Sequence, residues 1–108
     1  MKYLSRPEEI VLLAVCKLGN DAYGVTIRKH VQEATDKYWS IGAIYVPLER
    51  LERKGFVRSY ASEPTAERGG RSKRYFSITE EGSEALEELK KVNQAIWSGY
   101  PGIAADKR

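Results

Sequence analysis

The sequence predicts an α+β domain that is mainly helical and carries one small β-hairpin. Apolar residues recur at helical spacing in several segments, and two short runs rich in aromatic and branched residues flank a loop that contains Pro64 and Gly69-Gly70. A chain of 108 residues can form one modest core. With 42% hydrophobic and 31% charged residues, its composition is typical of a soluble globular protein.

The first two helices are expected at residues 6–18 and 23–34. Ser5 is a suitable N-cap because Glu8 follows three residues later, and Gly19 can end the first helix. The apolar residues of this helix cover more than one face, so we expect a surface beyond the domain's own core to cover the remainder. In the second helix, apolar residues recur at i, i+4 and i+7, namely Ile27, Val31 and Ala34.

The third helix is expected to begin after Ser40, a suitable cap, and to end at Gly55, which can adopt the left-handed conformation. One apolar stripe runs along it, formed by Ile41, Ile44, Leu48 and Leu51. Pro47 lies inside this helix, where it removes a backbone hydrogen bond and clashes with the carbonyl of Ala43. We therefore expect a kink or a loosened first turn.

Extended runs at residues 56–62 and 73–79 predict a hairpin with a long tip, and a fourth helix is expected at residues 80–98. This order of elements is that of a winged helix-turn-helix with an added C-terminal dimerisation helix. In such a domain the third helix can enter the major groove of DNA while the hairpin, the wing, lies along an adjacent groove or backbone. We assign residues 1–79 to the DNA-binding domain, 80–98 to the dimerisation helix and 99–108 to a flexible tail.

Charge is distributed unevenly around the hairpin. The net charge is only +3, but four cations fall within seven residues, Arg68, Arg71, Lys73 and Arg74, and five glutamates follow between residues 80 and 88. This polarity indicates one anionic partner at a defined place. Glycines let the tip approach phosphates closely, and the cations release counterions from a duplex. The same composition also fits a solvated basic turn on an unrelated α+β domain.

Three segments carry a family resemblance: AYGVTIRKHV at 22–31, WSIGAIYVPLERLERKGFV at 39–57 and RGGRSKRYFSITEEG at 68–82. In order and spacing they resemble the PadR family of bacterial winged-helix transcriptional regulators, up to about Leu89. The resemblance implies a homodimer that binds double-stranded operator DNA, usually represses, and often releases DNA when a small molecule or stress signal arrives. It also implies that the short form, with one C-terminal helix, dimerises through that helix and the N-terminal one.

The start of the third helix supplies the first candidate DNA-contact residues, which are Ser40, Gly42, Ala43 and Tyr45. The first three are small or short, so base edges and phosphates can approach closely, and exposed N–H groups favour anions. Tyr45 can donate its hydroxyl to a phosphate or pack as an aromatic under the wing. The family commonly has proline directly after this tyrosine, whereas here Val46 follows and the proline is Pro47.

The start of the second helix and the wing supply the other candidates. Tyr23 and Gly24 match the Tyr-Gly pair of the family, and Tyr23 can touch a backbone phosphate or serve as an N-terminal staple. Alternate residues of a strand point in opposite directions, so Arg71, Lys73 and Arg74 cannot all face DNA. The wing residues that we favour for DNA contact are Arg68, Arg71 and Lys73.

An apolar stripe along the fourth helix has near-heptad spacing and suits a partner helix. It is formed by Leu86, Leu89, Val92 or Asn93, and Ile96. Packing on the chain's own first helix is compatible with part of this stripe. Trp97 lies close to it, where two copies in a dimer can either sandwich a small, flat aromatic effector or fill the seam with their indoles.

Catalysis is not expected, because one histidine, His30, and one cysteine, Cys16, cannot form an ordinary metal site or a catalytic triad. We predict no enzyme activity, cofactor or metal.

Cys16 lies in the apolar run 10–16 and is expected to be a buried structural thiol. This run is too short to span a membrane, and the N-terminus lacks a signal-peptide pattern, so we expect a cytoplasmic protein. The alternative function is a winged-helix adaptor that binds an acidic or other protein partner.

Overall fold

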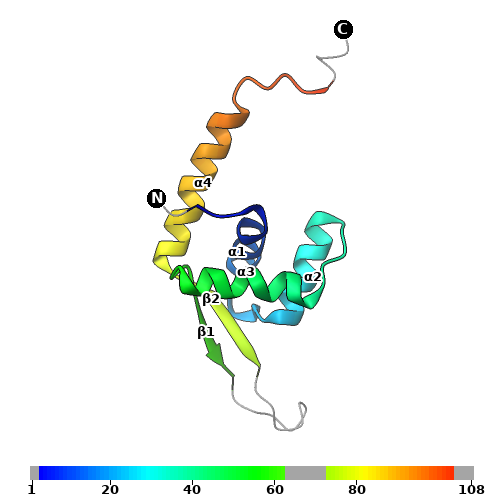
Figure 1. Ribbon diagram of the computed structural model, residues 1–108, viewed down its shortest axis with the longest axis vertical. Coiled ribbons are helices and arrows are strands. Elements are labelled where there is room, and N and C mark those ends of the chain that lie inside the picture. The colour runs from blue at the N-terminus through cyan, green and yellow to red at the C-terminus, as the bar shows by residue number, and fades with distance from the viewer. Residues whose placement is uncertain (1–2, 63–72, 104–108) are drawn as a thin grey trace.

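The computed structural model describes residues 3–62 and 73–103 (Figure 1). In chain order its elements are α1 (Arg6–Leu18), a 3-10 turn (Gly19–Asp21), α2 (Gly24–Thr35), α3 (Ile41–Arg53), β1 (Val57–Ala61), β2 (Arg74–Ile78) and α4 (Glu80–Trp97). The predicted α+β class is confirmed, and the elements follow their expected bounds closely. The tip of the predicted hairpin, residues 63–72, and the last part of the predicted tail, residues 104–108, lie outside the described residues.

Local caps begin and end the helices as the sequence predicts. At the start of α1, the Glu8 N–H donates to Ser5 Oγ at 3.3 Å, and the Ser5 N–H donates to Glu8 Oε1 at 2.7 Å. The Ala43 N–H likewise donates to Ser40 Oγ at 3.1 Å at the start of α3. Gly55, just after α3, has a φ of 81° and turns the chain into β1.

Helix α3 continues without interruption from Ile41 through Pro47 to Arg53. Proline has no N–H, so the carbonyl of Ala43 receives no bond from residue 47. Pro47 itself is buried on the core side of the helix. The proline therefore does not end the helix, and the Ser40 cap holds its first turn.

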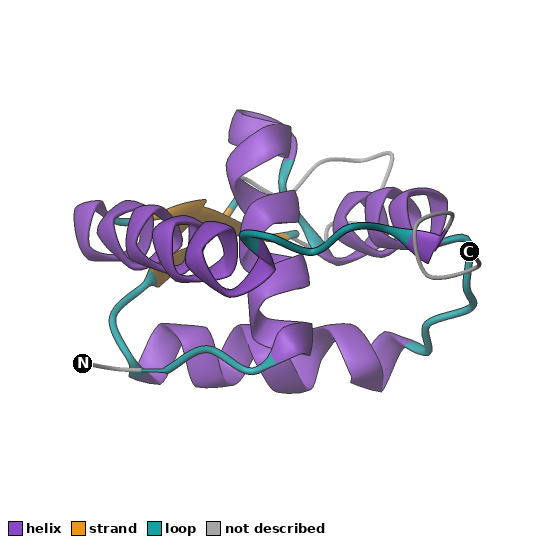
Figure 2. Ribbon diagram, turned by 90° about the horizontal axis from the view of Figure 1, so that it is seen from above, coloured by secondary structure: helices purple, strands orange, loops and turns teal. Residues whose placement is uncertain are grey.

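The core lies where α1, α2, α3 and the hairpin meet. Its buried apolar residues are Val11, Leu12, Ala14, Val15, Ala22, Ile27, Val31, Ile44, Leu48, Leu51, Phe56, Val57 and Phe76. Helices make up most of the fold, and the two strands form one small sheet beside them (Figure 2). Phe76 is only 1% exposed, so it anchors the hairpin to the helical core.

Cys16 is exposed, so the expectation of a buried thiol was wrong. The apolar run of α1 is wider than the face that the core covers, and Leu13 on the same helix is also 38% exposed. This agrees with the expectation that the domain's own core leaves part of α1 uncovered. A continuous apolar run shows that a helix is apolar all round, but not which side its neighbours cover.

The hairpin is an antiparallel pair in which Val57 lies opposite Ile78 and Ala61 lies opposite Arg74. Tyr23, just before α2, forms an isolated bridge with Tyr75 on the free side of β2. Next to this bridge, the Phe76 N–H donates to the carbonyl of Ala22 at 2.8 Å. The start of α2 is thus joined to β2 by backbone pairing.

Helix α4 extends from the end of the hairpin and runs away from the body in the direction opposite to the wing (Figure 1). Its first turn is capped by Thr79, whose Oγ1 accepts the Gly82 N–H at 3.0 Å. The far half of α4 carries exposed apolar side chains, among them Ile96 and Trp97. In the described part of the chain, no helix has both the length and the apolar character needed to cross a bilayer.

Candidate nucleic-acid interface

The first turn of α3 and its cap carry small side chains. We call α3 the reading helix, because it is the helix expected to enter the major groove. Ser40 and Gly42 are exposed and Ala43 is partly exposed. Ser40 Oγ accepts the Ala43 N–H, so its own O–H remains able to donate to another acceptor. The helix dipole places partial positive charge at this end, which favours a phosphate there.

Tyr45 lies between α2 and the wing. Its ring meets Phe76 edge-on, with centroids 6.4 Å apart and planes at 62°. A Cβ added to Gly24 would lie 2.9 Å from Tyr45 Cζ, so the absence of a side chain at Gly24 lets this tyrosine sit against the start of α2. The ring therefore packs beneath the wing, one of the two placements expected, and its hydroxyl reaches the beginning of α2.

A row of aromatic rings crosses the outer face of the hairpin. Tyr60 and Tyr75 stack across the strands with centroids 5.7 Å apart and planes at 18°, and Tyr75 meets Tyr23 at 5.2 Å. Lys73 Nζ lies 4.1 Å from the centroid of the Tyr23 ring. Two predicted DNA-contact residues, Tyr23 and Lys73, are therefore neighbours at the junction of α2 and the wing.

Arg74 points the other way, toward the reading helix. Its Nη2 lies 2.6 Å from Glu52 Oε1 and donates to Ser59 Oγ at 3.1 Å. Ser59 Oγ also donates to Glu52 Oε2 at 2.5 Å. Strand alternation separates Lys73 from Arg74, but the pairing of Arg74 with Glu52 could not be read from the sequence. The other two wing candidates, Arg68 and Arg71, lie outside the described residues.

Arg28 makes contacts that the sequence did not predict. Its Nε donates to the carbonyl of Trp39 at 2.7 Å, and its guanidinium carbon lies 5.3 Å from the Tyr38 ring centroid. The Trp39 N–H in turn donates to Gln32 Oε1 at 3.0 Å. These bonds fix the turn between α2 and α3, and therefore the position at which the reading helix begins.

A partly buried ion pair ties α1 to the end of α3. Lys54 Nζ lies 2.8 Å from Glu8 Oε2 and donates to the carbonyl of Tyr3 at 2.9 Å. Burial raises the pKa of Glu8, but hydrogen bonds from Lys54 and Ser5 outweigh it, so the net pKa is below the ordinary carboxyl value. The carboxylate is therefore held ionised where α1 meets the end of α3.

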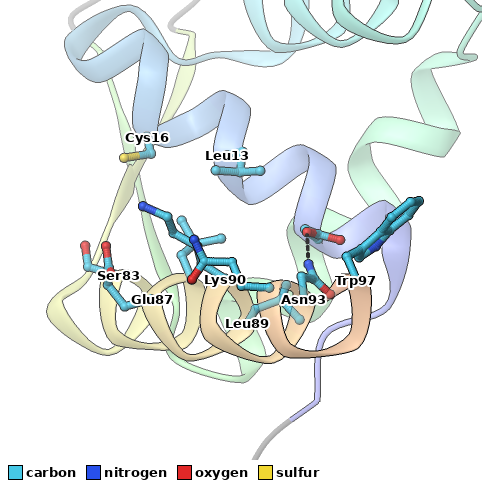
Figure 3. Close-up of a pocket in the computed structure, with 11 residues that line it drawn as sticks. Leu13, Cys16, Ser83, Glu87, Leu89, Lys90, Asn93 and Trp97 are labelled. Atoms are coloured by element: carbon cyan, nitrogen blue, oxygen red, sulfur yellow. Dashed lines mark hydrogen bonds between the residues drawn. The ribbon is translucent and has the colours of Figure 1, made fainter. Parts of the chain in front are cut away.

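A groove of about 600 Å³, the α1–α4 groove, lies between α1 and α4 (Figure 3). Its lining includes Leu13 and Cys16 from α1 and Leu86, Leu89, Asn93 and Trp97 from α4. Asn93 Nδ2 donates to Glu9 Oε2 at 3.2 Å across it. Leu86 packs partly against the core, whereas Val92 and Ile96 are 38% and 71% exposed. Part of the predicted dimer stripe therefore faces α1, and the rest faces solvent.

The arrangement of α3 and the wing defines a winged helix-turn-helix of the class that transcriptional regulators use to bind DNA. A model of the transcriptional regulator PadR-like family matches residues 12–88. The chain belongs to this family and is a DNA-binding transcriptional regulator.

Solved structures share this fold. A PadR family transcription regulator from Clostridium difficile R20291 is 26% identical, with a TM-score of 0.67 over 88% of this chain and 98% of that one. A Streptococcus mutans UA159 protein is 24% identical, with a TM-score of 0.71 over 97% and 94% of the two chains. A transcriptional regulator from Clostridium thermocellum is 24% identical, with a TM-score of 0.66 over 88% and 92%. No curated protein matches the chain.

Proposed function

We propose that this regulator binds operator DNA as a homodimer, represses a nearby promoter and is released by a small molecule or stress signal. The single observation that carries the proposal is the uncovered apolar surface of α4, where Ile96 is 71% and Trp97 is 65% exposed. A lone chain leaves this surface to water, whereas a second copy would bury it. In this proposal residues 1–79 read DNA, and residues 80–98 form the dimerisation helix.

The DNA contacts that we propose surround the junction of α2, α3 and the wing. The proposed residues are Tyr23, Ser40, Gly42, Ala43, Tyr45, Arg68, Arg71 and Lys73. The proximity of Lys73 to Tyr23 supports a phosphate contact at the start of α2, since an ammonium, a phenolic hydroxyl and a helix N-terminus all favour an anion. The exposed first turn of α3 supports base contacts in the major groove.

The dimer that we propose pairs α4 and α1 of one copy with α4 and α1 of the other. Leu86, Leu89, Val92, Asn93 and Ile96 would form its seam. The exposure of Val92 and of Leu13 on α1, both 38%, supports this pairing because each helix retains apolar surface beyond its own chain. Two reading helices must lie about 34 Å apart to occupy successive major grooves.

The first test measures size by sedimentation and follows it with a gel shift on the DNA upstream of the gene. A dimer that retards this DNA and not a scrambled duplex supports the proposal. A monomer that binds neither duplex favours the adaptor alternative.

The second test is the double variant Arg71→Ala with Lys73→Ala. It should flatten the salt dependence of binding by about one unit of slope per lost phosphate contact. An unchanged slope would move the interface elsewhere.

Trp97 is the proposed effector contact, because it is exposed and lines one end of the α1–α4 groove. A planar aromatic cation should quench tryptophan emission and release DNA in parallel. The control is Trp39→Phe, since Trp39 is only partly exposed and its Nε1 donates to Thr35 Oγ1 at 3.1 Å. Quenching lost only in Trp97→Phe supports an effector site. Quenching that depends on Trp39, or none, leaves Trp97 as part of the seam.

A further inference from the structure

We propose that Glu52, Ser59 and Arg74 form a clasp that sets the angle of the wing against the reading helix. In this inference Arg74 is a positioning residue that makes no phosphate contact of its own. It deepens the proposed function, because it rests on the proposal that the wing touches DNA beside α3. The clasp joins three elements, since Glu52 lies on α3, Ser59 on β1 and Arg74 on β2.

Each member of the clasp bonds to both of the others. Glu52 uses one carboxylate oxygen for Arg74, at 2.6 Å, and the other for Ser59, at 2.5 Å. Ser59 Oγ also accepts from Arg74 Nη2 at 3.1 Å. A triangle of three bonds resists rotation of the hairpin in more directions than one ion pair does, because each side chain is held from two sides.

The position of Arg74 along the hairpin gives the clasp its effect. Arg74 and Ala61 form the last strand pair before the tip, whereas Phe76 fixes the hairpin to the core two residues nearer the base. A hairpin held only at its base can swing, and its tip moves furthest. The bridge between Tyr23 and Tyr75 ties β2 to the start of α2, and Arg74 adds an attachment to α3 itself, so the segment that leads to Lys73 is held at one angle to the reading helix.

The charges distinguish positioning from a direct contact. The side chains of Arg74 and Glu52 are 46% and 36% exposed, so the pair by itself adds little to global stability. Removing the negative charge of Glu52 should strengthen DNA binding if only the net field matters, because a carboxylate near the duplex repels phosphate. The clasp predicts the opposite sign: Glu52→Gln weakens binding although it removes a negative charge.

The test uses the full chain and a duplex selected from a random pool by the wild-type protein. Glu52→Gln and Arg74→Gln should each weaken binding about three- to tenfold, and the double variant should be no weaker than Arg74→Gln alone. Arg74→Lys should recover part of the loss. The charge-matched control is Lys91→Gln, since Lys91 is an exposed cation on α4, which runs away from the wing. Thermal unfolding of each variant verifies that the fold is intact.

The salt dependence separates the outcomes. For a positioning role, the slope of log affinity against log salt should be the same in Arg74→Gln, in Lys91→Gln and in the wild type. A slope that falls by about one unit in Arg74→Gln alone would make Arg74 a phosphate contact and overturn the clasp, as would stronger binding by Glu52→Gln. If the wild-type protein selects no duplex from the pool, the proposed function fails first, and the clasp that rests on it is rejected with it.

Discussion

The base of the wing and the far half of α4 lie on opposite sides of the same core. They differ in how far their side chains are covered by the rest of the chain. At the wing, Phe76 is 1% exposed, and Arg74 is bonded to Glu52 and Ser59. Along α4, Ile96 is 71% exposed and Trp97 is 65% exposed. The side chains at the base of the wing are buried or hydrogen-bonded within one chain, whereas α4 retains apolar surface that a second molecule can cover. One chain therefore packs the base of the wing but leaves the far half of α4 exposed to solvent.

The largest difference should appear when one apolar side chain is truncated in each region. Phe76→Ala should lower the free energy of unfolding by about 3–5 kcal/mol, because it empties a packed site between the hairpin and the helices. Ile96→Ala, measured as a monomer at low protein concentration, should change it by less than about 0.5 kcal/mol. Urea denaturation followed by circular dichroism measures both. Equal losses would mean that α4 is as fully packed within one chain as the wing.

The second prediction concerns self-association. Leu89→Glu should weaken it at least about a hundredfold, because the variant would bury a carboxylate in the seam. Lys91→Glu, on the opposite face of α4, is the control and should leave the dimer intact. Analytical ultracentrifugation over a dilution series distinguishes the two. A Leu89→Glu protein that still sediments as a dimer would place the seam elsewhere.

Two neighbouring glutamates on α1 provide a finer comparison, since Glu8 bonds to Lys54 and Glu9 accepts from Asn93 across the α1–α4 groove. Glu8→Gln should lower the free energy of unfolding by about 1–3 kcal/mol at neutral pH, and Glu9→Gln should lower it by much less because its contact is more exposed. The measurement is urea denaturation of both variants across a pH series.

The sign of the pH dependence follows from the lowered pKa of Glu8. Ionised Glu8 stabilises the fold fully above the ordinary carboxyl pKa of 4.5, and this contribution is lost as the pH falls through the lower folded value. The gap between the wild type and Glu8→Gln should therefore be widest at neutral pH and close under acid. A gap that widens below pH 4.5 would contradict the assignment.

The smallest effect is expected at the exposed aromatic pairs. Tyr60 stacks on Tyr75 within the sheet, whereas Trp97 meets Tyr100 edge-on at 5.4 Å after the end of α4. Tyr60→Ala should lower the free energy of unfolding by about 0.5–1.5 kcal/mol. Tyr100→Ala should leave it almost unchanged and alter only the emission of Trp97. Thermal unfolding and fluorescence measure the two effects, and a larger loss for Tyr100→Ala would reverse the comparison of regions.

Element bounds could be predicted because the signals are local: Ser5 and Glu8 form a capping box, and Gly55 supplies the left-handed turn. The exposure of Cys16 could not be predicted, because it depends on where α4 lies relative to α1. The pairing of Arg74 with Glu52 depends on the angle between the hairpin and α3. Strand alternation predicts that Arg74 faces away from Lys73, but it does not say which side chain lies opposite.

Pro47 divides the reading helix into two parts that should open at different rates. The part after it carries two fully buried side chains, Leu48 and Leu51, whereas the part before it carries one, Ile44, and lacks the bond that residue 47 would have donated to Ala43. We expect amide hydrogens in the first turn to exchange by local opening while the later turns exchange only on global unfolding. In the complex that we propose, the end of the helix that meets DNA can thus adjust its backbone to a base sequence while the core stays folded.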